Sequence, residues 1–110
     1  MAAEQHLNRL QFFEGRMAPE DIRPRQTHVM NDKVGRYADQ MARHGYDGFP
    51  PIETVQTSKG ITSSDGHHRR AAAMRSGLKS VPVYGTTDTG IPPGMTEISR
   101  ERYDDYWDRQ

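Results

Sequence analysis

The segment that decides the fold is Thr62-Ser63-Ser64-Asp65-Gly66-His67-His68-Arg69-Arg70, followed directly by the run Ala71-Ala72-Ala73. The residues from Ile61 to Ser63 are typical of a strand, and Asp65-Gly66 is a turn signal. The alanine run favours a helix from His67 to Ser76, which Gly77 ends. This stretch therefore predicts a strand, a turn and a helix in immediate succession.

A helix that starts directly after a strand offers an anion its first backbone N–H groups and the positive end of its dipole. Glycine at the turn lets a ligand approach the backbone, hydroxyls add donors, and arginine suits bidentate contact with phosphate. Asp65 would either cap the helix or hold Mg²⁺ between phosphate oxygens. On spacing alone, a capped and solvated helix start explains the same residues. The predicted phosphate-binding residues here are Ser63, Ser64, Gly66, Arg69 and Arg70.

Working outward, a second helix is predicted over Asp32 to His44, with Asn31 as its N-cap and Gly45 after its end. Its apolar face is formed by residues at helical spacing, namely Val34, Tyr37, Ala38 and Met41. Ile52 to Gln56 and Ile61 to Ser63 are predicted to form a hairpin around the turn Ser58-Lys59-Gly60. A last strand is predicted over Val81 to Tyr84, where Pro82 indicates a strand start or a sheet edge.

The ends of the chain are predicted to be helical. A rough apolar stripe of Leu7, Leu10 and Phe13 predicts a helix from Ala3 to Phe13, before a short strand near Arg16 to Ala18. Residues 86–94 are predicted to be a loop, and a helix from about residue 99 to 107 follows, capped by its first serine. We expect one domain, with an N-terminal helix over 1–15, a core over 16–85, and a loop and C-terminal helix over 86–110.

Composition narrows the possible functions. The 110 residues include no cysteine, which excludes disulfides, thiolate catalysis and sulfur-based metal sites. The net charge is zero, unlike that of a typical sequence-independent DNA binder, although Lys59 to Lys79 holds five basic residues against one acid. No run is long enough to span a bilayer. We therefore expect a cytoplasmic protein with no membrane partner.

The motif residues resemble a known family. Asp65-Gly66-His67-His68-Arg69 with the alanines behind it, then Gly77-Leu78, then Val81-Pro82-Val83, resembles the ParB/sulfiredoxin-like superfamily. Earlier landmarks follow in the same order: Arg23-Pro24-Arg25-Gln26 resembles the first loop, and Phe49-Pro50-Pro51-Ile52 resembles the segment before the central strand. The resemblance implies an α/β (α+β) fold, a small mixed sheet with packed helices, that binds nucleotides or nucleic acid.

The resemblance also implies ligands. Partition ParB proteins bind CTP with Gly-Glu-Arg-Arg at this place, where Gly66 and Arg69 match and His67 and His68 depart from the motif. It implies a nucleoside triphosphate (CTP or ATP) with Mg²⁺, and it adds Arg23 and Arg25 to the phosphate-binding set. Sulfiredoxins need a cysteine in this loop, so that activity is excluded.

Another branch of the superfamily, similar to free-serine kinases, carries Asp-Gly-His-His-Arg at this loop and needs an acidic base near the first loop. Residues 25–28 contain no acid, although Glu20, Asp21 and Asp32 lie close in sequence. His28 is a candidate base there, and an exposed loop histidine is the alternative interpretation. Further members of the superfamily act as nucleases or as toxin modules of secreted bacterial weapons.

Three functions are therefore open. The first is a binding module for the phosphate of a nucleotide or nucleic acid, and it is the one we favour. The second is a Mg²⁺-dependent enzyme for phosphoryl transfer or phosphodiester cleavage, in which Arg69 and Arg70 stabilise charge, Asp65 holds the metal, and His67, His68 or His28 moves a proton. The third is an adaptor that has kept only the fold. A homodimer or another protein partner is compatible with all three.

Overall fold

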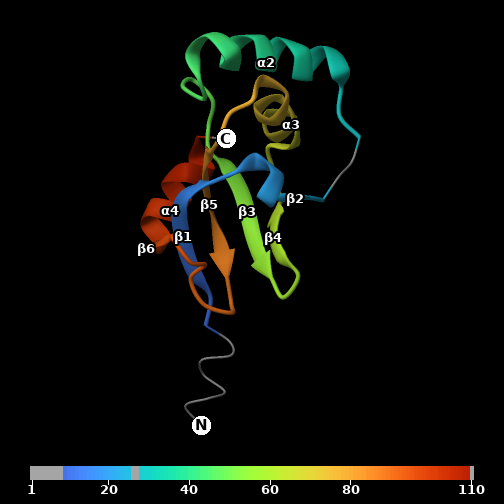
Figure 1. Cartoon of the computed structure of the whole chain (residues 1–110). Helices are drawn as coiled ribbons and strands as arrows, with labels where there is room; N and C mark the ends of the chain where they lie inside the picture. The colour runs from blue at the N-terminus through green and yellow to red at the C-terminus, as the bar shows by residue number, and fades with distance from the viewer. Residues whose placement is uncertain (1–8, 26–27, 110) are drawn as a thin grey trace.

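The computed structural model describes residues 9–25 and 28–109, which form one mixed sheet with helices packed on it (Figure 1). The predicted fold class is confirmed. The strands are β1 (Gln11–Met17), β2 (Arg23–Pro24), β3 (Ile52–Thr57), β4 (Gly60–Ser63), β5 (Val81–Thr87) and β6 (Thr96–Ile98). The helices are the short 3-10 helix η1 (Pro19–Asp21) and the α-helices α2 (Asn31–His44), α3 (His67–Ser76) and α4 (Arg100–Asp108).

The strands run in the order β2-β4-β3-β5-β1-β6. β5 lies inside the sheet, parallel to β3 and antiparallel to β1, so that Phe13 stands opposite Gly85. The predicted hairpin of β3 and β4 is confirmed, and β2 pairs with β4 in parallel. Gly85 is required by this packing, because a Cβ there would overlap the carbonyl oxygen of Thr54 on β3.

The main apolar core lies between the sheet and the pair α2 and α3. Alternate residues of a strand point to opposite faces, so Ile52, Val81 and Val83 face these helices while Glu53 and Tyr84 face the other side. α2 adds one helical face to this core, as its spacing predicts. Its buried residues there are Val34, Ala38 and Met41.

The prediction of a helix from Ala3 to Phe13 is wrong where the structure describes it. Residues 1–8 lie outside the described part of the chain, and Gln11–Met17 form strand β1. The helix-like spacing of Leu10 and Phe13 is overridden by pairing, because β1 is hydrogen-bonded to β5 on one side and to β6 on the other. Residues 11–15 therefore belong to the sheet, and the predicted short strand at Arg16 is its end.

Other boundaries also differ. Met30, not Asn31, is the N-cap of α2, and no side chain caps that end. β5 continues through Thr87, which shortens the predicted loop, and β6 was not predicted. Pro82 is close to the start of β5, as predicted, but this strand lies inside the sheet and not at its edge.

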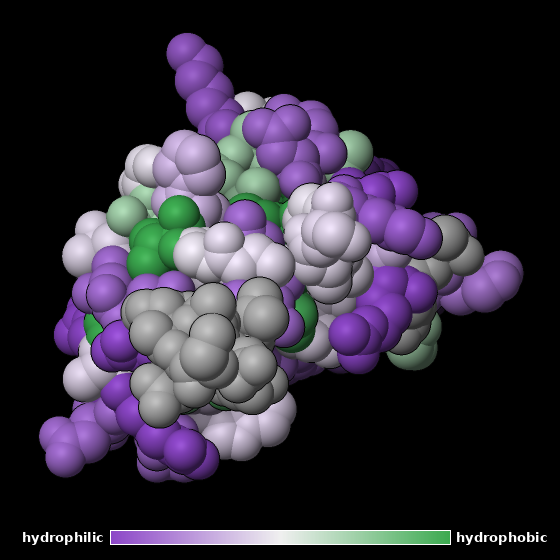
Figure 2. Space-filling view, turned by 90° about the horizontal axis from the view of Figure 1, so that it is seen from below, coloured by the Kyte–Doolittle hydropathy of each residue, from purple (hydrophilic) through white to green (hydrophobic). Residues whose placement is uncertain are grey.

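The C-terminal helix α4 packs beside β1 and β5, on the face away from α2 and α3 (Figure 1). Its predicted cap is confirmed, since the Ser99 hydroxyl accepts a hydrogen bond from the Arg102 N–H at 3.1 Å. Seen from the end opposite α2, the coloured surface is mostly hydrophilic, with hydrophobic residues in separate small areas (Figure 2). None of the described helices is long and apolar enough to cross a membrane.

Candidate phosphate-binding site

The strand–turn–helix predicted from the sequence is present, and Gly66 is its pivot. This residue is the N-cap of α3 with a φ of 87°, a left-handed conformation that favours glycine. A Cβ there would lie 3.0 Å from Nη2 of Arg69. No side chain caps the helix, and its first backbone hydrogen bond runs from the Arg70 N–H to the Gly66 oxygen. The N–H groups of His67, His68 and Arg69 therefore have no acceptor within the helix.

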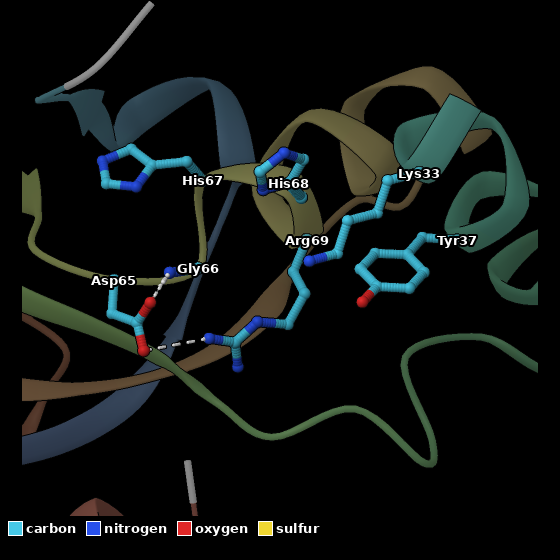
Figure 3. A pocket seen from close by; sticks show the side chains of 7 residues that line it. All are labelled: Lys33, Tyr37, Asp65, Gly66, His67, His68 and Arg69. Atoms are coloured by element: carbon cyan, nitrogen blue, oxygen red, sulfur yellow. Dashed lines mark hydrogen bonds and ion pairs between the residues drawn. The ribbon is translucent and has the colours of Figure 1, made fainter. Parts of the chain in front are cut away.

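A cavity of about 370 Å³ lies beside this helix start (Figure 3). One wall is the turn and the first residues of α3, from Asp65 to Arg69, and the other is Lys33 and Tyr37 of α2. The Lys33 ammonium lies 5.7 Å from the centroid of the Tyr37 ring, whose edge-on contact with Phe49 has a centroid distance of 5.0 Å. The cavity thus combines helix N–H groups, a cation and an aromatic ring.

Sequence reasoning missed Lys33 and Tyr37 as site residues. Their spacing of four residues places them on one face of α2 near its start, which was the available signal. Only the packing of α2 against α3 brings this face to the glycine turn.

Arg69 borders the cavity but is largely occupied by the protein itself. It is only 9% exposed, and its Nη1 donates to the backbone oxygens of Pro50 and Pro51 at 2.6 and 3.1 Å. Its Nη2 lies 3.5 Å from Oδ2 of Asp65. Arg69 therefore ties α3 to the segment before β3, and its contribution to an anion is mainly a positive charge at the cavity wall.

Asp65, the predicted magnesium ligand, already interacts with two donors of the protein. Its Oδ1 accepts a hydrogen bond from the Gly66 N–H at 2.8 Å, and its Oδ2 faces Arg69, so each carboxylate oxygen already has a donor beside it. Within residues 9–25 and 28–109, no three histidine or acidic side chains gather where they could hold a metal ion. Asp65 also does not cap α3, because it precedes the N-cap and bonds only the N–H of Gly66.

The two histidines occupy different environments. Nε2 of His68 accepts a hydrogen bond from the Met30 N–H at 3.1 Å, which connects the first turn of α3 to the start of α2. Burial, and secondarily Lys33, lowers the pKa of His68 below its ordinary 6.5. Burial also lowers the pKa of His67, against the opposing effect of Asp65. Nε2 of His67 is buried and has no hydrogen-bond partner among the described residues.

Three of the predicted phosphate-binding residues connect elements around the cavity and do not line it. The hydroxyl of Ser63 is 3.5 Å from the Arg23 carbonyl oxygen, and that of Ser64 donates to Oε1 of Glu53 at 2.7 Å. Nε of Arg70 donates to the Ile22 carbonyl oxygen at 2.7 Å, which fixes the end of η1 on α3.

The first-loop residues also lie outside the cavity lining. Nη1 of Arg23 donates to the Lys59 carbonyl oxygen at 2.7 Å. His28 is exposed, ahead of α2. The charge of Arg25 nonetheless reaches the site, because it contributes to the lowered pKa of His67.

A second cavity, of about 450 Å³, lies at the other end of β3 and β5. Its lining includes Leu10, Val55 and Asp88 but no basic residue, and the hydroxyl of Thr87 there already donates to Gln56 at 2.6 Å. This second cavity lacks the positive groups that the cavity at α3 has.

Solved structures of other proteins share this fold. The chromosome-partitioning protein ParB from Caulobacter crescentus, complexed with CTP-gamma-S, matches 66% of this chain at 18% identity with a TM-score of 0.56. Sulfiredoxin from Arabidopsis thaliana matches 86% of the chain at 18% identity with a TM-score of 0.55. The chain has the ParB/sulfiredoxin-like fold. Protein Atu1540 from Agrobacterium tumefaciens shares this fold over 90% of the chain at 16% identity, with a TM-score of 0.56.

The lengths of these relatives differ. The chain covers 96% of the sulfiredoxin but only 43% of the ParB and 49% of Atu1540. No protein-family model and no curated protein sequence matches it. The ParB/sulfiredoxin-like fold is therefore visible in the structure and not in overall sequence similarity.

Proposed function

We propose that the cavity between α2 and the start of α3 binds the phosphate groups of a nucleotide. The observation that carries this proposal is the uncapped N-terminus of α3, which meets the ammonium of Lys33 across one cavity. The first N–H groups of α3 and the helix dipole both favour an anion at this point, and a lysine on the facing wall adds a positive charge.

Tyr37 supports a nucleotide over a bare phosphate. Its ring forms part of the same wall as Lys33, and the volume of about 370 Å³ is within the usual range for small-molecule sites. An aromatic side chain beside an anion site is suited to stacking against a base. The ParB neighbour complexed with CTP-gamma-S has the same fold, which makes CTP the first nucleotide to test and ATP the second.

The direct test is calorimetric titration of CTP and ATP into the purified chain, with Lys33→Gln as the variant. We expect the variant to lose about tenfold in affinity, or about 1.4 kcal/mol, which is slightly below the range for hydrogen bonds to charged groups. Lys79→Gln is the matched control, because Lys79 is exposed and lies outside the cavity lining. Equal affinity of both variants for the nucleotide would remove Lys33 from the site.

Phosphoryl transfer or phosphodiester cleavage is the second candidate, and His67 is the observation that favours it. Its ring has a free Nε2 among the described residues, and its lowered pKa leaves it unprotonated near pH 7, as a general base requires. His68 fits less well because its Nε2 is already an acceptor for Met30. If the chain turns over a nucleotide or nucleic acid, His67→Asn should lower the rate by about 10²–10⁴-fold and leave affinity nearly unchanged.

A further inference from the structure

Glu53 on β3 carries a buried carboxylate that does not line the candidate site. Its residue is 7% exposed, and it faces away from the core of α2 and α3. Oε2 accepts a hydrogen bond from the Tyr103 hydroxyl at 2.8 Å, and Oε1 accepts one from the Ser64 hydroxyl at 2.7 Å. Neither of the ion pairs between described residues, Arg69 with Asp65 and Arg102 with Glu14, involves Glu53. Both donors to its carboxylate are neutral hydroxyls.

The backbone of Glu53 binds the same loop as its side chain. Its carbonyl oxygen accepts hydrogen bonds from the N–H groups of Ser64 at 2.9 Å and Asp65 at 3.5 Å. One residue of β3 therefore restrains two successive residues of the turn, and the next residue is the N-cap Gly66. Burying a carboxylate is costly unless its oxygens are hydrogen-bonded, so losing either hydroxyl donor should loosen this arrangement.

Tyr103 brings α4 into this arrangement. Its ring packs on Tyr84 and Phe12 of the sheet, with centroid distances of 5.5 and 4.8 Å. Burial, and then the hydrogen bond to Glu53, raises the pKa of the Tyr103 hydroxyl, which keeps it a donor near neutral pH. A continuous series of contacts thus runs from α4 through Glu53 to Ser64 and Asp65. Neither Glu53 nor Tyr103 lines the cavity.

We propose that Glu53 and Tyr103 are positioning residues, which hold the turn of residues 64–66 so that the first N–H groups of α3 face the cavity. By this arrangement the C-terminal helix acts on ligand binding from the opposite face of the sheet. The expected change in nucleotide affinity rests on the proposed function. The expected change in amide hydrogen exchange of the turn rests on its geometry and needs no ligand.

The test compares two tyrosines of α4 that each donate a hydrogen bond to a carboxylate. Tyr103→Phe removes the donor to Glu53, and Tyr106→Phe removes the donor to Glu14, at 2.5 Å in the native protein. Both variants keep the ring, so both should fold. Ser64→Ala breaks the same arrangement from the loop side and should behave like Tyr103→Phe.

Two measurements decide the outcome. Amide hydrogen exchange of the free protein should be at least threefold faster at residues 64–66, whose N–H groups are hydrogen-bonded in this arrangement, in Tyr103→Phe and Ser64→Ala than in Tyr106→Phe. Calorimetric titration should show CTP affinity at least threefold lower in the same two variants, with Tyr106→Phe like the native chain. Equal exchange at residues 64–66 in the two tyrosine variants would overturn the positioning role. Native protein that binds neither CTP nor ATP would refute the proposed function alone, and the exchange comparison would still decide the positioning role.

Discussion

The two faces of the sheet are covered in different ways. Under α2 and α3 the contact is apolar, with residues such as Met41, Ala72 and Ile52 almost fully buried. Under α4 the contact is made by tyrosine rings and hydroxyls, and Tyr103 and Tyr106 donate to carboxylates that arise from the sheet. α4 itself has no buried residue, whereas α2 buries three.

This difference assigns different tasks to the two faces. Apolar burial supplies most of the stability but is not directional, so it keeps α3 against the sheet without fixing each backbone group of its first turn. Hydrogen bonds are directional, and those of Glu53 reach the residues just before Gly66. We infer that the apolar face holds the fold together and the polar face adjusts the site.

Met41→Ala should leave a cavity in the apolar core and cause the largest loss in the free energy of unfolding. Met41 is 1% exposed, and truncating a buried methionine to alanine costs about 2–5 kcal/mol. Urea unfolding followed by circular dichroism measures this loss. A loss well below 1 kcal/mol would mean that the apolar face does not dominate stability.

Gly66→Ala should separate stability from ligand binding. Gly66 and Gly77 have left-handed φ values of 87° and 79°, so alanine at either position should cost about 1–2 kcal/mol. Only Gly66 lies beside the cavity, where a Cβ would also crowd the Arg69 guanidinium.

Urea unfolding and CTP titration of both alanine variants give the comparison. Gly66→Ala should lose at least as much stability as Gly77→Ala, and only Gly66→Ala should lose affinity. Similar affinity in the two variants would show that the turn does not form the binding site.

The sequence predicted α3 well because its signals are local. Gly66 and Gly77 bracket a run of good helix formers, and both are left-handed in the structure. β1 was missed because its signal is not local: the partner of Phe13 is Gly85, far along the chain. The spacing of Leu10 and Phe13 therefore predicted a helix where tertiary pairing makes a strand.

Half of the candidate site was predictable for the same reason. The turn at Asp65 and Gly66 is a contiguous motif, whereas Lys33 and Tyr37 become site residues only when α2 packs on α3. Arg70, predicted to bind phosphate, lies outside the cavity lining, and its Nε donates to the carbonyl oxygen of Ile22, a contact that no local sequence pattern predicts.

Ser99→Ala tests the polar face through the cap of α4. Loss of an N-cap serine costs about 1 kcal/mol, and Ser99 here accepts from the Arg102 N–H. Fraying of α4 should weaken the bond from Tyr103 to Glu53 and speed amide exchange at Ser64. Ser99→Asp keeps a capping oxygen and should restore slow exchange at Ser64. Unchanged exchange in Ser99→Ala would mean that α4 does not influence the turn.

A weaker effect is expected from pH. The pKa values of His67 and His68 are lowered in the folded protein, chiefly by burial. The unfolded chain therefore binds protons more readily, so stability is full above about pH 6.5 and falls as the pH drops through the lowered pKa values.

His68→Gln keeps a side-chain acceptor for the Met30 N–H without titrating, so its stability should fall less with pH than that of the native chain. Urea unfolding at several pH values between 7 and 5 measures the slope. An identical slope in the variant would exclude His68 from this dependence.

The central claim, a nucleotide phosphate at the start of α3, is tested most directly by titrating CTP into ¹⁵N-labelled protein and following the backbone amide signals by NMR. Our account predicts that the largest saturable shifts occur at His67, His68 and Arg69, whose N–H groups lack an acceptor within the helix. Shifts confined to the cavity around Thr87, or no saturable shift at these three amides with either CTP or ATP, would contradict it.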